Sequence, residues 1–327
     1  MSKTDRDGRV AEALRSDVVI GTRCLTRDFR KLRAVDALDL TVWQGELFGL
    51  IGPDGAGKTT TLRLLAGLLD ITEGTATVAG HDLAREREAI KPKIGYMAQR
   101  FSLYAELTVV ENLRFFAELY DVSAEERAAR TERLLAFAGL TAFKSRRAEH
   151  LSGGMKKKLA LACTLIHNPP ILLLDEPTTG VDPVSRREFW DILTELYTGG
   201  TTIVVSTPYM DEADRCSRVG LMYQGRLIRC DPPEVIRAEI GDELIELQAE
   251  DWRAAQALVG GLQGVSDVLT YGESLHLLVD GADERLPEIK ARLEEEGLVY
   301  RFLRRSRPRM EEAFISLVKD RERKELL

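Results

Sequence analysis

The first two thirds of the chain contain continuous and alternating apolar runs that predict strands. Short alternating segments from Val18 to about Arg33 are typical of strands, and "LTVWQGELFGLIG" at 40–52 predicts two more, joined by a turn. The runs "PPILLLDEP" at 169–177 and "TTIVVST" at 201–207 are short and have continuous apolar centres. Such runs are typical of strands buried on both faces, so we expect a mostly parallel sheet.

A second pattern, with apolar residues three and four positions apart, predicts helices between these strands. It appears at 59–69 and through most of 108–167, where we expect a helical subdomain of about 100–167. Strands that alternate with helices indicate an α/β domain, which we assign to residues 18–238. Residues 1–17 are polar and charged, and we expect them to form a flexible arm.

The pattern changes near residue 240 and predicts a separate domain of residues 239–327. The expected elements are, in order, strand 243–248, helix 251–260, strand 264–270, strand 274–279, helix 283–296, strand 299–305 and helix 310–319. The first six follow a βαββαβ order, which is typical of the ferredoxin-like fold. We therefore expect a small α+β accessory or regulatory domain. A length of 327 residues agrees with two domains, because it is long for a single core.

Composition and charge describe an ordinary soluble protein and argue against several classes. The net charge is −7 and the isoelectric point is near 5.4, which argues against a general nucleic-acid binder. The four cysteines are far apart and lack a CxxC pair, as expected of reduced thiols in the cytosol. No signal peptide is evident, and no apolar run approaches the roughly 20 residues that span a bilayer.

The segment "GPDGAGKTT" at 52–60 matches the phosphate-binding pattern GxxxxGK[ST]. It follows an apolar strand and precedes a helix, which is the context that this motif requires. Glycines let backbone N–H groups surround a phosphate, and the helix N-terminus adds a favourable dipole. We expect Lys58 to contact the β- and γ-phosphates and the Thr59 hydroxyl to bind Mg²⁺. The predicted nucleotide-binding residues of this loop are Gly52, Pro53, Asp54, Gly55, Ala56, Gly57, Lys58, Thr59 and Thr60.

Two further segments carry candidate chemistry. Asp175 and Glu176 end the apolar run at 169–177, and open α/β sheets bind ligands at the carboxyl edge of their strands. We therefore expect Asp175 to hold the water shell of Mg²⁺ and Glu176 to act as a general base. "LSGGM" at 151–155 precedes a helical run and offers a hydroxyl and free amides to an anion; the alternative is a helix start that Ser152 simply caps.

Together these segments resemble the nucleotide-binding subunit of an ABC transporter. Their order along the chain is the phosphate loop, Gln99 in "YMAQRFSLY", "LSGGM", "ILLLDEP", "TTGVDP" and "VVSTPYMDEA", and the resemblance covers about residues 18–235. It implies the P-loop NTPase fold of an ABC cassette, with ATP and Mg²⁺ as cofactors and ATP hydrolysis as the activity. It also implies that two such subunits, alike or different, associate head to tail around two ATP molecules.

The resemblance implies roles for single residues. Phe29 is similar to the aromatic residue that stacks on adenine; its alternative is a core phenylalanine. Gln99 would sense Mg²⁺ and the γ-phosphate. The implied catalytic residues are Glu176, Lys58 and Gln99, and the implied Mg²⁺ ligands are Thr59, Gln99 and Asp175. The residues implied to face the second subunit and its nucleotide are Ser152, Gly153, Gly154 and Asp182.

The same resemblance predicts a membrane partner and a location. The segment after Gln99 is where the family docks its membrane subunits, although packing within the helical subdomain is an alternative for each side chain. The candidate contacts are Phe101, Leu103 and Tyr104. The chain would then be cytoplasmic and peripheral on the inner face of the membrane, attached through the permease, with no nucleic-acid partner.

Three segments make the chain similar to exporter ATPases for drugs, lipids or polysaccharides: "TTGVDP", "STPYMDEA" and "PRMEEAFISL" at 308–317. We therefore predict the ATP-binding subunit of an exporter, which couples ATP binding and hydrolysis to efflux by separate membrane subunits. One alternative is a soluble ABC ATPase acting on ribosomes or DNA, but neither a second cassette nor a long coiled coil is seen. Another is an ATP-binding regulatory module with weak turnover, against which Glu176 argues.

The sequence departs from the family pattern at two places. The family has histidine at position 208, where it contacts the γ-phosphate, and this chain has Pro208. We expect Thr207 to cap a helix whose first residue is Pro208, a position that proline fits well, so that the fold and ATP binding survive. "KKK" at 156–158 stands where Gln or Arg is common, and we expect a solvated basic helix face.

The departure at position 208 predicts a gain of activity. The substitution Pro208→His is expected to raise the single-turnover rate of ATP hydrolysis, because it restores a γ-phosphate contact worth about 10²–10³ in rate if it acts like one transition-state donor. The measurement is a single-turnover assay with excess enzyme. An unchanged rate would mean that Pro208 is only structural and that another group fills the role.

Overall fold

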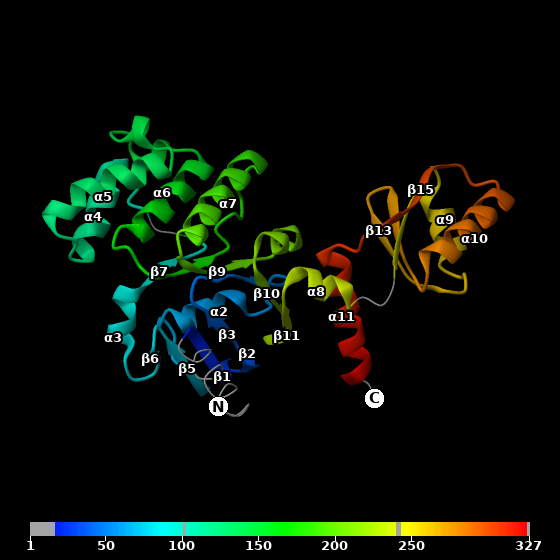
Figure 1. The fold of residues 1–327 in the computed structure, drawn as a ribbon, viewed down its shortest axis with the longest axis horizontal. Helices are drawn as coiled ribbons and strands as arrows, with labels where there is room; N and C mark the ends of the chain where they lie inside the picture. The colour runs from blue at the N-terminus through cyan, green and yellow to red at the C-terminus, as the bar shows by residue number, and fades with distance from the viewer. Residues whose placement is uncertain (1–16, 101–102, 240–242, 326–327) are drawn as a thin grey trace, which may run out of the picture. The chain divides into compact units, whose positions relative to one another are not determined.

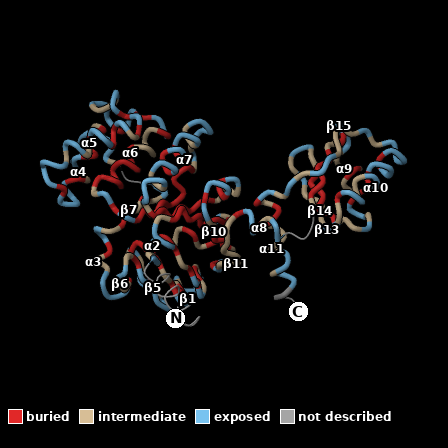
Figure 2. Tube along the Cα trace, in the orientation of Figure 1, coloured by how far each residue is buried: buried red, intermediate tan, exposed pale blue. Residues whose placement is uncertain are grey.

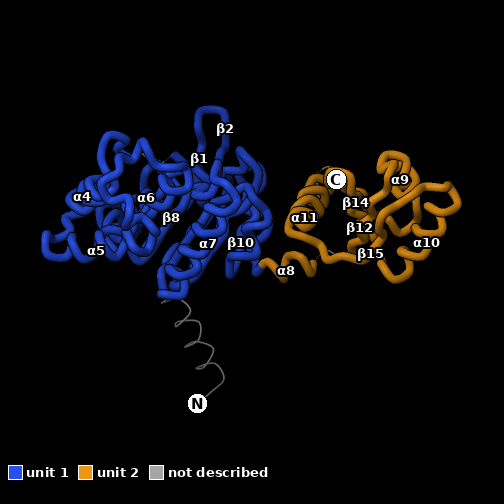
Figure 3. The backbone as a smooth tube through the Cα atoms, turned by 90° about the horizontal axis from the view of Figure 1, so that it is seen from above, with its two compact units in different colours: residues 1–232 blue, residues 233–327 orange. Residues whose placement is uncertain are grey.

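The computed structural model describes residues 17–100, 103–239 and 243–325, and it divides into two compact units (Figures 1 and 3). Unit 1 comprises residues 1–232 and unit 2 comprises residues 233–327. The division precedes the boundary expected at 238/239, because helix α8 (Pro233–Ala238) packs against the last helix of unit 2. The predicted arm of residues 1–17 lies outside the described residues except for Asp17.

Unit 1 is built on a six-stranded, mostly parallel sheet. The strands in spatial order are β11 (Arg226–Asp231), β10 (Arg218–Tyr223), β4 (Leu47–Ile51), β9 (Thr202–Thr207), β8 (Ile171–Asp175) and β7 (Ile94–Met97). Neighbours are parallel except for β11, which runs antiparallel to β10. Every residue of β4, β8 and β9 is buried, as their continuous apolar runs predict (Figure 2).

A second, antiparallel sheet packs against the first through a shared core. Its strands are β2 (Leu32–Leu38), β1 (Val18–Phe29), β5 (Glu73–Val78) and β6 (His81–Asp82), with β3 (Thr41–Trp43) paired to β1. The two strands predicted at 40–52 therefore exist, but β3 and β4 belong to different sheets. Helix α2 (Lys58–Leu65) contributes to the core between the sheets, and the short helix α3 (Arg87–Ile90) follows β6.

Four longer helices complete unit 1. In the sequence, β7 and β8 are separated by helices α4 (Val109–Leu119), α5 (Ala124–Phe137) and α6 (Gly153–Leu165). Helix α7 (Pro183–Thr198) follows β8 and precedes β9. The predicted helical character of 108–167 is thus confirmed. Polar residues set the helix starts: Thr108 and Glu111 form a capping box at α4, and Ser123 caps α5. No helix of the described residues is long and apolar enough to cross a membrane.

Unit 2 contains a four-stranded antiparallel sheet with helices packed on it. The spatial order is β13 (Val265–Tyr271), β14 (Ser274–Val279), β12 (Glu243–Ala249) and β15 (Tyr300–Ser306). Helices α9 (Trp252–Val259) and α10 (Ala282–Glu295) cover one face and share its apolar core. This arrangement confirms the βαββαβ element order and the ferredoxin-like fold expected from the sequence.

Helix α11 (Met310–Glu325) is joined to the same sheet by a buried histidine–glutamate pair. The Glu312 side chain is fully buried, and its Oε1 lies 2.6 Å from Nδ1 of His276 on β14. The Arg309 N–H donates to the other Glu312 oxygen at 2.7 Å. Burial opposes ionisation of Glu312, but the bonds from His276 and from backbone N–H groups outweigh it, so the pKa of Glu312 lies below its usual value.

This pair makes the stability of unit 2 depend on Glu312. The substitution Glu312→Ala is expected to lower the free energy of unfolding of unit 2 by about 3 kcal/mol, because it removes the partner of buried His276 Nδ1 and the acceptor of the Arg309 N–H, while Glu246 stays 3.7 Å from His276 Nε2. Folding lowers the pKa of Glu312 below its usual value near 4.5. The stabilisation by its carboxylate is therefore complete above pH 4.5 and is lost as the pH falls through the lowered pKa. Urea unfolding at several pH values measures both effects. Asp320→Ala, at an exposed position of α11, is the control and should change stability by no more than about 0.5 kcal/mol.

Candidate active site at the carboxyl edge of the sheet

The loop of residues 52–57 joins β4 to α2 and closes around the Lys58 side chain. Lys58 is buried, and its Nζ donates to the carbonyl oxygens of Gly52 at 2.7 Å and Pro53 at 3.0 Å. Gly57 has a φ of 104°, and a Cβ at this residue would lie 2.5 Å from the Ala34 carbonyl oxygen. A side chain at Gly52 would be still closer to the Met222 carbonyl, at 2.2 Å. The glycines therefore let the loop pass close to neighbouring backbone, as a phosphate-binding loop requires.

Asp175 connects the end of β8 to the start of α2 and to β9. Its Oδ1 accepts from the Thr59 hydroxyl at 2.9 Å and from the Ser206 hydroxyl at 2.8 Å. Its Oδ2 is buried and has no hydrogen-bond partner within the described part of the chain. A buried carboxylate oxygen without a donor is costly, and a bound cation is one way to satisfy it. No group of three or more His, Cys, Asp or Glu residues in the described ranges is arranged to hold a metal by itself.

Glu176 stands at the centre of the site in a strained conformation. Its φ is 46°, which is uncommon for a residue with a side chain, and such outliers occur often at functional sites. Its backbone N–H donates to the Ser206 hydroxyl at 3.0 Å, which holds this turn beside β9. One carboxylate oxygen lies 3.4 Å from the Lys58 ammonium, and the other accepts from the Gln99 amide at 2.7 Å and from the Thr179 hydroxyl at 3.3 Å. The structure thus brings together the three residues predicted to be catalytic.

The segment after β9 corrects one prediction. Thr207 does not cap a helix that begins at Pro208: the 3₁₀ helix η4 spans Met210–Arg215, with Tyr209 as its N-cap residue. The Thr207 hydroxyl instead accepts from the Tyr209 N–H at 3.1 Å, which forms a turn around Pro208. Proline is tolerated here because the turn uses the N–H of the following residue.

A buried carboxylate on η4 fixes this segment and was not identified from the sequence. Glu212 accepts from the Thr178 hydroxyl at 2.8 Å, from Arg186 Nε at 2.7 Å and from Trp190 Nε1 at 2.9 Å. The Arg186 guanidinium also lies over the Tyr209 ring, 4.4 Å from its centroid. These contacts tie the turn at Pro208 to α7 and to the loop after β8. Only the tertiary structure shows them, because the partners are distant in sequence.

Ser152 and Asp182 occupy N-terminal ends of two adjacent helices. Ser152 caps α6 and accepts from the Met155 N–H at 3.3 Å, while Asp182 caps α7 and accepts from the N–H groups of Val184 and Ser185. Backbone and side-chain bonds from Ser185 lower the pKa of Asp182. Among the described residues neither cap makes a hydrogen bond with the group around Lys58 and Glu176.

Phe29 ends β1 and is not a core residue. Its side chain is 39% exposed, and the Arg27 guanidinium lies over its ring at 4.6 Å from the centroid. The alternative of a buried phenylalanine is therefore excluded. An exposed ring at the end of a strand is available for stacking on a planar ligand.

The prediction of a solvated basic face at 156–158 is wrong for two of its three lysines. Lys157 Nζ donates to the Gln99 carbonyl oxygen at 3.0 Å and lies 3.5 Å from that of Glu176. Lys158 pairs with Glu188 of α7, and its side chain is only 16% exposed. The charge pattern alone did not predict this, because long lysine stems cross apolar surface before their ammonium groups reach polar partners.

The candidate docking residues after Gln99 are partly described. Phe101 lies outside the described residues. Leu103 is half-buried, and Tyr104 is 46% exposed with its ring 4.4 Å from that of Phe115 on α4. Tyr104 thus packs against α4 of unit 1 on one side and is exposed to solvent on the other.

Comparison with known proteins agrees with this geometry. The model of the ABC transporter family matches residues 35–179. The chain is 36% identical to the Nod factor export ATP-binding protein I of Sinorhizobium fredii, over 93% of its own length and 87% of that protein. The chain belongs to the ATP-binding proteins of ABC transporters. This finding confirms the family predicted from the sequence.

Two further similarities define the extent of the match. The chain is 43% identical to the probable multidrug ABC transporter ATP-binding protein YbhF of Escherichia coli over 71% of its length, and it spans only 40% of that relative. A solved dimeric ATP-binding cassette, bound to ADP and Pi after hydrolysis, is similar at 29% identity with a TM-score of 0.60. That match covers 65% of this chain and 98% of the other. The predicted P-loop ABC cassette fold is therefore confirmed.

The loop geometry predicts unequal effects for two of its glycines. Gly55 and Gly57 both have positive φ, but only Gly57 has backbone within reach of a new Cβ. Gly55→Ala should cost about 1–2 kcal/mol of conformational strain, and Gly57→Ala should cost at least about 1 kcal/mol more because the clash with the Ala34 carbonyl is added. Urea unfolding of the two variants tests this. Equal losses of stability would show that the loop moves away from Ala34 without cost.

Proposed function

We propose that the chain hydrolyses MgATP and couples this reaction to export by separate membrane subunits. The observation that carries the proposal is the convergence of Lys58, Glu176 and Gln99, joined by an ion pair and a hydrogen bond, beside Asp175, which binds the Thr59 hydroxyl. These residues come from three segments of the chain, since Asp175 and Glu176 are adjacent. The exporter relatives support the direction of transport, since one is named a multidrug transporter protein and another an export protein.

Nucleotide binding would replace contacts that Lys58 makes with other residues of the site. Lys58 donates to two carbonyl oxygens of its own loop and lies near Glu176. Phosphate oxygens are stronger acceptors for an ammonium group than neutral carbonyls. We expect Lys58 to transfer to the β- and γ-phosphates, which the loop amides and the N-terminus of α2 also attract. Phe29 would stack on the adenine ring.

The residues present fit a magnesium ion. Thr59 and Asp175 already share a hydrogen bond, and the second Asp175 oxygen is buried without a donor. Mg²⁺ prefers oxygen ligands and retains several waters and phosphate oxygens, so few protein ligands are needed. We propose Thr59, Asp175 and Gln99 as the residues that hold it, directly or through water. When bound, the ion neutralises charge that develops on the phosphates.

Glu176 is the proposed general base. Glu176 as a whole residue is only 5% exposed, and Gln99 and Thr179 orient its carboxylate. Once Lys58 turns to the phosphates, one carboxylate oxygen is free to accept a proton from the attacking water. Gln99 then reports the state of the nucleotide, because its amide shares the same carboxylate.

A second subunit would complete the site. Ser152, Gly153 and Asp182 are exposed at the N-terminal ends of α6 and α7. Buried Gly154 allows these helices to approach, since its Cβ would lie 2.4 Å from the Ser185 hydroxyl oxygen. Helix N-termini attract phosphate, and these two do not serve their own chain's loop. We propose that they face the γ-phosphate held by a partner subunit in a head-to-tail dimer.

The location follows from the partner. We propose a cytoplasmic subunit held at the inner face of the membrane by a permease, with Leu103 and Tyr104 at the contact. Tyr104 is exposed and its ring rests on Phe115, as expected of an anchor at a protein interface. Unit 2 is proposed to be an accessory or regulatory domain.

Replacing the proposed base separates binding from hydrolysis. Glu176→Gln should lower the rate of MgATP hydrolysis by at least about 10²-fold, because the amide cannot accept the proton. ATP binding should persist, and a dimer should accumulate with MgATP in size-exclusion chromatography. Glu195→Gln, on the exposed face of α7, is the matched control and should behave like the unmodified chain. Full activity of Glu176→Gln would overturn the assignment of the base, and an unmodified chain that neither binds nor hydrolyses ATP would overturn the proposed function.

A further inference from the structure

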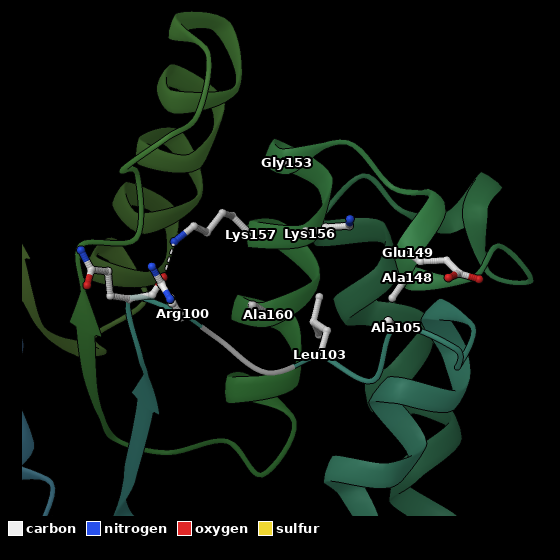
Figure 4. A pocket seen from close by; sticks show the side chains of 10 residues that line it. Arg100, Leu103, Ala105, Ala148, Glu149, Gly153, Lys156, Lys157 and Ala160 are labelled. Atoms are coloured by element: carbon white, nitrogen blue, oxygen red, sulfur yellow. Dashed lines mark hydrogen bonds between the residues drawn. The ribbon is translucent and has the colours of Figure 1, made fainter.

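A cavity of about 400 Å³ lies between helix α6 and the loop that follows β7 (Figure 4). Gln99, Arg100 and Leu103 line it on the loop side, and Gly153, Lys156 and Lys157 line it on the helix side. Figure 4 shows the Lys157 side chain extending across the gap toward the end of β7, whereas Lys156 points to the opposite side, where Glu149 lies. Two neighbouring lysines of one helix thus have different surroundings.

The Lys157 ammonium bridges two backbone carbonyls that belong to different segments of the site. It donates to the Gln99 oxygen at 3.0 Å and to the Glu176 oxygen at 3.5 Å. Gln99 follows β7 and Glu176 follows β8, whereas Lys157 lies on α6, in the helical part that separates these strands in the sequence. One side chain therefore fastens the helical part to both residues whose side chains share the Gln99–Glu176 hydrogen bond.

The charge balance supports a fixed position for this group. Burial lowers the pKa of Lys157, while the carboxylates of Glu176 and Asp175 act in the opposite direction. A lysine that is half-buried and bound to two carbonyls has given up part of its hydration. The contacts with the site compensate for that loss, which a lysine on a solvated face would not need.

We propose that Lys157 is a positioning residue for ATP hydrolysis: it holds the Gln99 loop and the Glu176 turn in register with helix α6. This inference rests on the proposed function, because it assigns Lys157 to the base and sensor of that reaction. Lys157 acts on their backbone, through its bonds to the two carbonyl oxygens. The strained φ of 46° at Glu176 makes such support necessary, since a relaxed turn would move the carboxylate.

The role predicts a selective loss of turnover. Lys157→Met keeps the apolar stem and removes the donor, and we expect the kcat of ATP hydrolysis to fall about tenfold, with KM and ATP affinity within about twofold of the unmodified chain. Lys157→Arg, which retains a donor of similar reach, should recover most of kcat. Lys156→Met is the matched control, since Lys156 lines the same cavity but points to the opposite side from Lys157, and it should leave kcat unchanged.

An unchanged kcat in Lys157→Met, or a loss shared equally with Lys156→Met, would overturn the proposal. So would a fall in ATP affinity or melting temperature that accounts for the loss.

The same series separates this inference from the proposed function. If the unmodified chain hydrolyses ATP and Glu176→Gln does not, the proposed reaction stands, and the Lys157 variants then test only the positioning role. If the unmodified chain shows no hydrolysis, the proposed function fails first. ATP affinity, measured with a fluorescent ATP analogue, distinguishes this case from a chain that does not bind nucleotide.

Discussion

The site is organised around two adjacent carboxylates that are buried at the carboxyl end of β8. Asp175 is fully buried and Glu176 is 5% exposed, and a buried charge is stable only with close partners. The partners come from every surrounding segment: the Lys58 ammonium, the hydroxyls of Thr59 and Ser206, and the Gln99 amide. Lys58, Thr59 and Gln99 also have proposed roles with the nucleotide and its Mg²⁺. The same contacts therefore hold the site together and place its groups for ATP.

The contacts of the Lys58 ammonium with its own loop explain why this loop needs glycine. The loop must bring its carbonyls within reach of the Lys58 ammonium while it passes the backbone of Ala34 and Met222. Side chains at Gly52 or Gly57 would push it away from that position. A loop held in this way loses less conformational freedom when phosphate binds, because its backbone is already ordered.

Much of the site could be predicted from the sequence because its residues lie in short motifs with fixed local geometry. The loop of 52–60, Asp175 and Glu176 depend on a strand, a turn and a helix that follow each other directly. Ser206, Glu212 and Lys157 could not be predicted, since their partners are distant in sequence and their residue types are common. The start of η4 was misplaced for a related reason: the Thr207 hydroxyl binds the Tyr209 N–H, so the helix begins after the turn and not at Pro208. In unit 2 the element order was predictable from hydrophobic periodicity, but the buried His276–Glu312 pair was not.

The ties between the sheet and the helical part constrain how the two can move. Lys157 joins α6 to the backbone of Gln99 and Glu176, and Glu212 joins α7 and the Glu176–Thr178 loop to the turn at Pro208. Helices α6 and α7 also meet at Gly154 and Ser185. A displacement of α6 must therefore either stretch the Lys157 bonds or carry the Glu176 turn with it. A nucleotide that changes the position of Glu176 must therefore favour one position of α6. By the reciprocity of coupled equilibria, a partner that moves α6 must change the affinity for that nucleotide by the same factor as the nucleotide changes the affinity for the partner.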